Sequence, residues 1–413
     1  MKFLFWSFLG LIVYCYFGYP FLLSLVAKVG PKKIRKSGFQ PNVSIVISVC
    51  NEEDVIEAKL RNFLSLDYPK GKLQIIIGSD GSSDRTNEII KKFSDPRIQF
   101  FEFTTRQGKI KILNQLIQKV KDEVVVFTDA RQILAQDAIR ELVKNFADPQ
   151  IGCVSGELEF LQKEGGTAKG VQLYWEYEKF IRKNESNIHS MLGATGAIYA
   201  IRRELYRNPP ENIILDDMYV PFKIIEQGYR AIFDDSAKAY DEVADSPREE
   251  YRRKTRTLFG NYQIFAVLPQ MFNPWRSAVA VQLFSHKFLR VIAPILLIII
   301  FGPFTITVEI SEEILYCLLL ALNWALTSGN VNPLRFVSRG LIEYPMSFHS
   351  PGFSTGISQV NDVLDFNSKL GFMLSVNIIS VISSAPLFAI FNLTIIMSLR
   401  YMRFLLKDLL TEK

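Results

Sequence analysis

The chain has 413 residues, of which 48% are hydrophobic and 22% charged, and its formal net charge at pH 7 is +6. This length suffices for one large domain and an additional region, and the hydrophobic residues can fill a core. The charge is small for the length and spread along the chain, which disfavours a nucleic-acid-binding protein. The four cysteines are scattered without a Cys-x-x-Cys pair, so neither a disulfide framework nor a zinc site is expected.

The first 28 residues form an apolar segment of membrane-spanning length, with aromatic residues throughout. A cleaved signal peptide is the competing interpretation, but its apolar core would be only about 7 to 15 residues long. Five basic residues lie within Lys28–Lys36, and such an excess of positive charge favours the cytoplasmic side. We therefore expect a retained transmembrane anchor at 1–28, followed by a domain that begins in the cytoplasm.

Residues 41–260 have the composition of a soluble α/β domain, in which four short apolar runs alternate with helical patterns. Strands are expected at Val43–Val49, Leu73–Gly78, Ile98–Phe103 and Glu123–Thr128. Helices are expected near Glu53–Leu66, Asp84–Phe93, Lys109–Val120 and Gln136–Phe146. This alternation predicts four βα units in a doubly wound, open α/β sheet.

Charged residues follow each of the four predicted strands. They are Glu52 after the first, Asp80 after the second, Arg106–Lys109 after the third and Asp129 after the fourth. Ligands of such sheets bind beyond the carboxyl ends of the strands. Neither a G-x-G-x-x-G loop nor a P-loop is present, so backbone cradling of phosphates is not expected. Acids at these positions instead favour a divalent cation that meets phosphate groups.

Two acids near the second strand have structural alternatives. Asp84 follows two serines and precedes a helical pattern, which favours a helix N-cap over a ligand. Asp80 precedes Gly81, and Asp-Gly is a common turn pair. Neither acid is therefore strong evidence for a site when it is considered alone.

Seven segments follow one another between Asn42 and Gln263: "VSIVISVCNEED", "LDYPKGKLQIIIGSDGSSDRT", "RQGKIKILNQ", "VVVFTDARQIL", "GATGAIYAIRRELY", "LDDMYVPFKIIEQGYR" and "EEYRRKTRTLFGNYQ". In order and spacing they resemble the inverting glycosyltransferases of family 2, the GT-A group that includes cellulose, chitin and hyaluronan synthases. The resemblance implies a GT-A domain, a doubly wound and mostly parallel α/β sheet, with N-terminal and C-terminal transmembrane helices.

The resemblance also implies residues that bind the donor. Glu52 and Asp80 would hold the nucleoside of a nucleotide sugar, with Lys109 nearby. Asp129 matches the first acid of the family's D-x-D motif, which binds the Mg²⁺ or Mn²⁺ that bridges the two phosphates. Arg131 stands where that motif has its second acid, and an arginine cannot ligate a cation. The chain therefore departs from the family pattern where the metal is bound.

Two further matches concern the chemical step. Asp217 matches the proposed catalytic base of the T-E-D motif. The residue type suits this role, since a carboxylate can take the proton of the attacking hydroxyl. Its neighbour Asp216 is expected to raise the pKa of Asp217, although both acids could instead only begin a helix that runs to Gln227. Arg256 matches the arginine of the Q-x-x-R-W motif and suits a departing diphosphate, or else belongs to a solvated basic face. Thr257 replaces the tryptophan of that motif, which disfavours long processive synthesis.

The remainder of the chain predicts a membrane region. Residues 261–290 resemble the interfacial helices of the family. A C-terminal membrane region at 291–399 is followed by a basic tail at 400–413. Three apolar blocks reach or approach spanning length within it, at Val291–Val308, Ile314–Ser328 and Phe372–Leu399. Four spans would leave the basic tail outside, against the charge rule, so the number of spans stays open.

These expectations combine into an integral membrane, inverting glycosyltransferase with a cytoplasmic catalytic domain. The expected partners are a nucleotide sugar, first of all a UDP-sugar, a glycan or lipid acceptor, and membrane lipids, without nucleic acid. A membrane-anchored scaffold or pseudo-transferase is one alternative, with which the residues at Arg131 and Thr257 are consistent. A nucleotidyltransferase is another, although "CNEED" lacks its Gly/Arg/Lys-rich loop.

Overall fold

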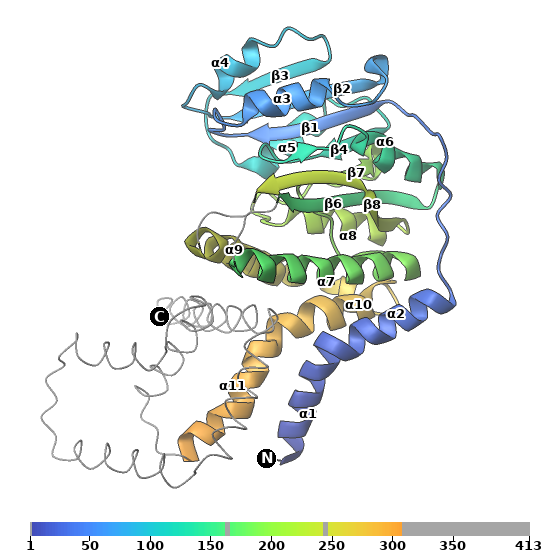
Figure 1. Ribbon diagram of the computed structural model, residues 1–413, viewed down its shortest axis with the longest axis vertical. Helices are drawn as coiled ribbons and strands as arrows, with labels where there is room; N and C mark the ends of the chain where they lie inside the picture. Colours follow the sequence, from blue (N-terminus) through green and yellow to red (C-terminus); the bar gives the residue numbers. More distant parts are fainter. Residues whose placement is uncertain (1, 162–165, 243–246, 308–413) are drawn as a thin grey trace, which may run out of the picture. The chain divides into compact units, whose positions relative to one another are not determined.

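The computed structural model describes residues 2–161, 166–242 and 247–307 (Figure 1). The predicted apolar blocks at Ile314–Ser328 and Phe372–Leu399 and the tail at 400–413 lie outside these residues. The chain divides into two compact units, and the one made of Gly10–Lys163 and Trp175–Ala293 carries the sheet. Every residue to which the sequence assigned a role in the site belongs to this unit.

One eight-stranded sheet organises the unit, in the order β3-β2-β1-β4-β7-β6-β8-β5 (Figure 1). The strands are β1 Val43–Val49, β2 Leu73–Asp80, β3 Ile98–Phe103, β4 Val124–Phe127, β5 Ile133–Leu134, β6 Ile151–Leu161, β7 Tyr199–Arg202 and β8 Arg230–Glu242. β1 to β4 pair in parallel, as do β6 and β8. β7 is antiparallel to both of its neighbours, and β5 is antiparallel to β8. The predicted mostly parallel sheet is therefore confirmed, with antiparallel pairs in its second half.

The described helices are α1 Lys2–Val13, α2 Tyr19–Val29, α3 Ile56–Leu64, α4 Thr86–Lys91, α5 Lys109–Ile117, α6 Ala138–Val143, α7 Gly166–Ile188, α8 Asp216–Glu226, α9 Pro247–Val267, α10 Ala280–Gln282 and α11 Leu289–Thr307. The four predicted strands correspond to β1–β4, and the four predicted helices to α3–α6. A π-helical segment, η6, covers Leu283–Phe288 and joins α10 to α11.

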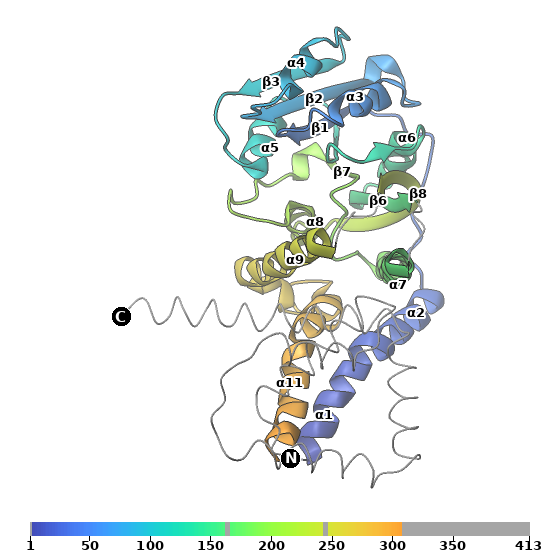
Figure 2. The same cartoon turned by 60° about the vertical axis from the view of Figure 1, so that its left-hand side comes forward.

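Two hydrophobic clusters cover the two faces of the sheet. Successive residues of a strand point to opposite faces, so β1 contributes Ile45 and Ile47 to one cluster and Val46 to the other. The first cluster also contains residues of α3 and α6, and the second contains residues of α5 and α8. Figure 2 shows α5 and α6 on opposite sides of β1. Each such aliphatic side chain contributes about 1.5–3 kcal/mol when it is fully buried, and β1 is thereby fixed as the centre of the parallel half.

The strand order creates a switch point between β1 and β4. The chain runs outward from β1 to β2 and β3, and then returns to place β4 on the other side of β1. Loops that leave neighbouring strands at such a point diverge to opposite faces, and ligands of open α/β sheets bind in the resulting crevice. The loops that follow β1 and β4 are those with Glu52 and Asp129, so the fold brings the two predicted positions together.

Two described helical stretches are long and apolar enough to cross a membrane by length and composition, Phe3–Val29 and Ala280–Leu297. The first coincides with the predicted anchor and exposes Phe17 and Phe21. The second begins within the segment predicted as interfacial, 261–290, and continues past its end. A buried core helix can meet the same criteria, so the spanning role of both stretches stays a prediction.

Candidate active site

Six charged side chains define a group at the carboxyl ends of β1 and β4, which we call the edge group. They come from the loops that follow these two strands and from the first turns of α5 and α8: Glu52, Lys109, Asp129, Arg131, Asp216 and Asp217. The sequence had assigned functions to four of them, and the fold supplies the reason why they meet.

Lys109, the first residue of α5, links two acids of the edge group. Its Nζ lies 2.9 Å from Oδ1 of Asp129 and 3.5 Å from Oδ1 of Asp216. Burial by itself would lower the pKa of Lys109, but these two carboxylates raise it above the usual range. The lysine is therefore a permanent positive charge held between the end of β4 and the start of α8.

Asp217 and Asp129 converge on the backbone at Gly196. The N–H of Gly196 donates to Oδ2 of Asp217 over 3.2 Å. A Cβ atom on Gly196 would lie 3.2 Å from Oδ2 of Asp129 and 3.6 Å from Oδ2 of Asp217, so a side chain there would crowd Asp129 and touch Asp217. The absence of a side chain at Gly196 leaves room in front of the two acids, which places them on a common site.

The two adjacent aspartates of α8 differ in exposure and in charge environment. Asp216 is 5% exposed, whereas Asp217 is partly exposed. Burial raises the pKa of Asp217 to about 6, the negative charges of Asp216 and Asp129 add to this rise, and Lys109 opposes it. A carboxyl group with a pKa near neutrality can act as an acceptor and donor of protons. Asp217 thus has the accessibility and the pKa that a base requires.

Glu52 and Arg131 pair across the switch point. The distance between Oε2 of Glu52 and Nε of Arg131 is 3.6 Å, and the two side chains are 22% and 58% exposed. Burial raises the pKa of Glu52, and the Arg131 guanidinium partly offsets this rise. The residue that replaces the second acid of the D-x-D motif therefore contacts the acid that follows β1.

Asp80 serves the neighbouring loop in this structure. It is 3% exposed, and its two carboxyl oxygens accept the N–H groups of Gln107 over 2.5 Å and of Gly108 over 2.8 Å. Gly108 has a φ of 96°, which a residue with a side chain rarely adopts. Asp80 thus holds the loop that leads directly into Lys109.

Asp84 was predicted as the N-cap of the following helix, and this prediction is wrong by one position. The residue that precedes α4 is Arg85. Asp84 instead accepts the N–H of Thr86 over 3.0 Å and that of Glu53 over 3.1 Å. It therefore satisfies an amide of the first helical turn and also ties that turn to the loop after β1. The structural interpretation of Asp84 holds, with this second contact added.

Lys59 is a functional candidate that the sequence reasoning missed. Its side chain is fully buried beneath the loop after β4, where Nζ donates to Oγ1 of Thr128 over 3.0 Å and to the carbonyl oxygen of Gln132. Burial lowers the pKa of Lys59 to about 7, and the charge of Asp129 partly offsets this effect. A signal was present, because Lys59 lies in the apolar stripe of α3 with Ile56 as its helical neighbour.

Arg256 lies on α9 and is exposed. One helical turn later, a Cβ on Gly260 would lie 2.5 Å from Cγ of Leu215, so the α9 backbone packs tightly against the segment that leads into α8. Gln263 strengthens this attachment by accepting the N–H of Ile214 over 3.0 Å. The described residues include no ion pair between Arg256 and the carboxylates of the edge group. Arg256 therefore lies one helical turn from the contact between α9 and Leu215, but it is not paired with the edge group.

The edge group offers Asp129 as a ligand for a divalent cation. No group of three or more His, Cys, Asp or Glu residues within the described ranges is arranged to hold a metal ion. Oδ2 of Asp129 nevertheless lies beside Gly196, on the side of Asp217, while Oδ1 contacts Lys109. Mg²⁺ that accompanies nucleotides commonly takes only one or two protein carboxylates together with phosphate oxygens. The residues thus fit a cation shared with a bound diphosphate, and they do not form a metal cage of their own.

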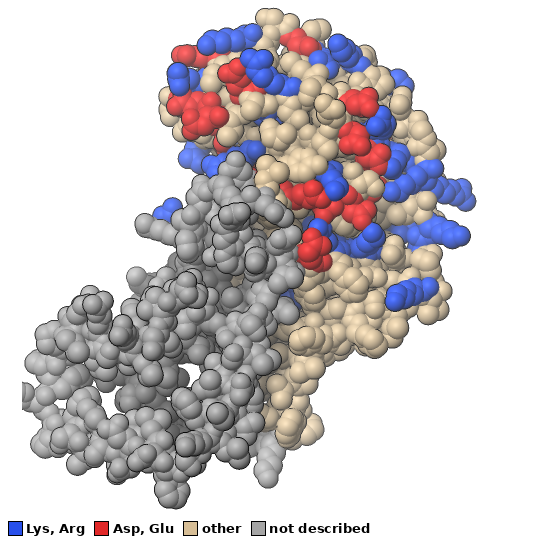
Figure 3. Space-filling view, in the orientation of Figure 1, with Lys and Arg blue, Asp and Glu red and all other residues tan. Residues whose placement is uncertain are grey.

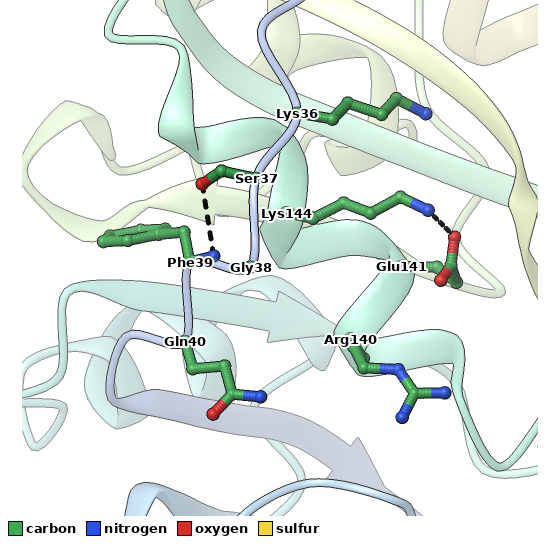
Figure 4. Close-up of a pocket in the computed structure, with 8 residues that line it drawn as sticks. All are labelled: Lys36, Ser37, Gly38, Phe39, Gln40, Arg140, Glu141 and Lys144. Atoms are coloured by element: carbon green, nitrogen blue, oxygen red, sulfur yellow. Dashed lines mark hydrogen bonds and ion pairs between the residues drawn. The ribbon is translucent and has the colours of Figure 1, made fainter.

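A separate cavity of about 350 Å³ lies between the segment before β1 and the helix α6 (Figure 4). Lys36, Arg140 and Lys144 line it. Each of these cations has an acidic partner, which is Asp234 for Lys36, Asp67 for Arg140 and Glu141 for Lys144. On the face shown in Figure 3, acidic and basic side chains are likewise interspersed over the sheet-bearing unit. The cavity therefore lacks the uncompensated charge of the edge group.

Comparisons with known proteins match a large part of the chain to one family and its fold. The model of the family "Glycosyl transferase family 2" matches residues 44–208, a range that contains Glu52, Asp80, Lys109 and Asp129. A poly-beta-1,6-N-acetyl-D-glucosamine synthase of Staphylococcus aureus (strain MSSA476) is 28% identical over 231 residues, which are 54% of this chain and 55% of the relative. The probable glycosyltransferase YdaM of Bacillus subtilis (strain 168) is 25% identical over 265 residues, 60% of this chain and 62% of that protein. The chain thus spans between half and two thirds of the length of these relatives.

A solved structure with the same fold is the mannosyltransferase PcManGT from Pyrobaculum calidifontis in complex with GDP-Man and Mn²⁺. It aligns with a TM-score of 0.59 and 24% sequence identity over 83% of this chain and 93% of that protein. The alignment supports the GT-A architecture of the eight-stranded sheet. Residues 44–208 thus match the model of glycosyl transferase family 2, and the sheet that contains them has the GT-A fold.

Proposed function

We propose that the chain transfers a sugar, with inversion, from a nucleotide sugar to a glycan or lipid acceptor at the cytoplasmic face of a membrane. The observation that carries this proposal is the convergence of Asp129 and Asp217 on Gly196, with Lys109 between the end of β4 and the start of α8. An acid with a raised pKa beside a fixed cation, in the switch-point crevice, suits a reaction that removes a proton and releases a phosphate leaving group.

The donor would lie across the carboxyl ends of β1 and β4. Glu52 would face its nucleoside, and Asp80 would shape the same pocket through the Gln107–Gly108 loop that it holds. Lys109 would contact the diphosphate. Asp129 would hold Mg²⁺ or Mn²⁺, which as a Lewis acid would neutralise charge on the phosphate oxygens.

The chemical step would be a single in-line displacement. Asp217 accepts the proton of the acceptor hydroxyl as the hydroxyl oxygen forms a bond to the anomeric carbon. The bond between that carbon and the diphosphate oxygen breaks at the same time, and the electron pair leaves with the nucleoside diphosphate. Lys109 and Arg256 stabilise the charge that develops on this leaving group. Inversion follows because the acceptor and the leaving group occupy opposite sides of the anomeric carbon.

The names of the relatives suggest which substrates to test first. One relative is named as a synthase of a poly-N-acetylglucosamine chain, and the solved mannosyltransferase contains GDP-Man. A UDP-sugar is the donor that we propose, with UDP-N-acetylglucosamine as the first candidate. Thr257, at the position of the family's tryptophan, favours the addition of one or a few sugars over long polymer synthesis.

A donor screen tests the proposal directly. The full-length protein, purified in detergent, is incubated with a panel of UDP- and GDP-sugars and short glycan or lipid acceptors, and release of the nucleoside diphosphate is measured. Acceptor-dependent release is expected from one donor, and it should disappear in the Asp217→Asn variant. Binding of a nucleotide sugar without turnover against any acceptor would instead favour the scaffold function. Reporter fusions at Lys36 should show that the domain begins on the cytoplasmic side.

A further inference from the structure

Arg131 occupies the position that follows Asp129 by two residues, in the loop that leaves β4 at the switch point beside β1. We infer that Arg131 binds the diphosphate of the nucleotide donor directly, in place of the second metal-binding acid of the family motif. This inference rests on the proposed nucleotide-sugar donor and adds a residue to its binding site.

The position of Arg131 suits a phosphate group. Its partner Glu52 follows β1, so the 3.6 Å contact between them reaches from one side of the switch point to the other. The side chain of Arg131 is 58% exposed, and a ligand in the crevice can therefore reach it. A guanidinium carries five N–H donors in a planar fork, so one side chain can serve a carboxylate and a phosphate together.

The loop that carries Arg131 is fixed at both ends. Buried Lys59 donates to Thr128 and to Gln132, the residues on either side of the Asp129–Arg131 segment. Oγ1 of Thr128 also donates to the carbonyl oxygen of Ala197 over 2.7 Å. A loop that is ordered before the ligand arrives loses less conformational entropy on binding. Arg131 is thus presented to the crevice from a rigid base.

The charges of the edge group support the same conclusion. Its four acids face two side-chain cations, and Lys109 already lies between Asp129 and Asp216. An arginine in place of an acid changes the local charge by two units in the direction that weakens metal binding and strengthens anion binding. The diphosphate is the anionic part of the donor, and the crevice beside Asp129 is where the proposed function places it.

A different role for Arg131 predicts a different result. If Arg131 only neutralised Glu52, its removal would disturb the nucleoside pocket, and uridine and UDP would lose affinity by the same factor. If Arg131 binds the diphosphate, only UDP loses affinity. The comparison of these two ligands therefore separates the two roles without any measurement of turnover.

The experiment measures binding of UDP and of uridine to the full-length protein in detergent by isothermal titration calorimetry, with Mg²⁺ and with EDTA. Arg131→Ala should weaken UDP binding about 10- to 100-fold, the range of a hydrogen bond to a charged group, and should leave uridine binding unchanged. Arg131→Lys should recover part of the loss. Arg140→Ala removes an exposed arginine on α6 that pairs with Asp67, and this matched control should bind UDP like the unmodified protein.

Restoring the acid provides a second test. Arg131→Asp should weaken UDP binding in EDTA as strongly as Arg131→Ala does, and Mg²⁺ should recover affinity in the aspartate variant more than in the alanine variant. Equal UDP affinity in the unmodified protein and in Arg131→Ala would overturn the inference, and so would equal losses for UDP and uridine. Failure of the unmodified protein to bind UDP would instead overturn the proposed UDP-sugar donor, so the two failures are distinguishable.

Discussion

Two groups of charged side chains in the sheet-bearing unit are built in opposite ways. The edge group lies at the carboxyl ends of β1 and β4. The second group, which we call the α7–η6 cluster, joins α2, α7, the π-helical segment and the start of α11, and its charged members are Glu178, Glu185, His286, Lys287 and Arg290. The first group has more acids than cations, whereas in the second the lysine and the arginine equal the two acids in number. We interpret this difference as one between a proposed ligand site and a structural contact.

The acids of the α7–η6 cluster have their partners within the fold, although among the described residues Oε2 of Glu185 has no hydrogen-bond partner. His286 is fully buried, with Nδ1 2.8 Å from Oε1 of Glu185 and Nε2 3.2 Å from Oε2 of Glu178. Tyr19 donates its hydroxyl to Glu185 over 2.8 Å, and Arg290 pairs with Glu178. Each acid therefore has at least two partners inside the protein. Such a buried network fixes one arrangement of helices, since an unpaired charge there would be costly.

The pKa shifts of Glu178 and Asp217 differ in direction between the two groups. Burial by itself would raise the pKa of Glu178, but Arg290, Lys287 and His286 hold it well below its usual range. Burial also raises the pKa of Asp217, and the neighbouring acids raise it further, so that it reaches about 6. Burial raises the pKa of both acids, so the neighbouring charges, cationic around Glu178 and mainly acidic around Asp217, account for the opposite shifts.

The largest expected effect concerns Asp217. Asp217→Asn keeps the size of the side chain and its hydrogen bond from Gly196, but it removes the base, and we expect kcat to fall about 10²- to 10⁴-fold. UDP binding should stay within a factor of about two, because the acid is assigned to the acceptor. Nucleotide release and calorimetric UDP binding measure the two quantities. Retained turnover would remove Asp217 from the role of base, and the contrast between the two groups would then lose its functional meaning.

The α7–η6 cluster should respond in stability. Glu178→Gln leaves Arg290 and Lys287 without their acid, and removal of one partner of a buried pair costs about 3–5 kcal/mol in the free energy of unfolding. A thermal-shift assay should show a clear loss in the melting temperature, with UDP affinity unchanged at a temperature where the variant is folded. Glu57→Gln is the matched control, because Glu57 forms an exposed pair with Arg61 worth only about 0.3–0.5 kcal/mol. A loss of UDP affinity in Glu178→Gln would mean that this cluster is not purely structural.

The parallel half of the fold was predictable because its signals are local. The runs at Val43–Val49 and Ile98–Phe103 consist mostly of β-branched or aromatic residues, and both became strands with the predicted bounds. The strands β5 to β8 were not predicted. β5 has only two residues, and β8 contains two consecutive aspartates and a lysine, so neither shows an uninterrupted apolar run. Their pairing depends on contacts between distant segments, which a local pattern does not contain.

The site was predictable where a residue follows a strand. Glu52 and Asp129 fall at strand ends, and the switch point brings such ends together. The partners within the group depend on side-chain geometry, so the pairing of Arg131 with Glu52 and the contacts of Asp80 with the 107–108 backbone did not follow from the sequence. The sequence indicated the burial of Lys59 only by placing a lysine in the apolar stripe of α3. At such a position the flexible side chain can usually extend its charged end into solvent.

Lys59 connects the two kinds of group, because it is buried like the α7–η6 cluster but supports the edge group. Lys59→Met keeps the length and removes both hydrogen bonds to the loop after β4. We expect the KM for the donor to rise about tenfold, the value of one to two lost hydrogen bonds from a charged donor, with a smaller change in kcat. Steady-state kinetics with varied donor, and UDP calorimetry, measure this split. Lys91→Met, an exposed lysine on α4, is the control. A lower melting temperature with an unchanged KM would show that Lys59 stabilises the fold without positioning the loop.

Near neutral pH the smallest expected effect is a pH dependence that arises from the excess of acids in the edge group. The base acts only when Asp217 is ionised, and its pKa is raised from 3.8 to about 6. Activity should therefore be full above pH 7, about half at pH 6, and should fall about tenfold per pH unit below the pKa. Stability responds with the opposite sign, since an acid with a raised pKa in the fold favours the folded state while it is protonated and loses that contribution as the pH rises through 6.

Asp216→Asn tests the cause of that midpoint. Removing the adjacent negative charge also leaves Lys109 with one acid fewer to neutralise, and both changes favour ionised Asp217. The midpoint of kcat/KM against pH, measured between pH 4.5 and 8, should therefore move toward lower pH in this variant. An unchanged midpoint would mean that burial alone raises the pKa of Asp217. The ratio of acids to cations would then no longer distinguish the edge group from the α7–η6 cluster, and burial of each acid would have to be compared instead.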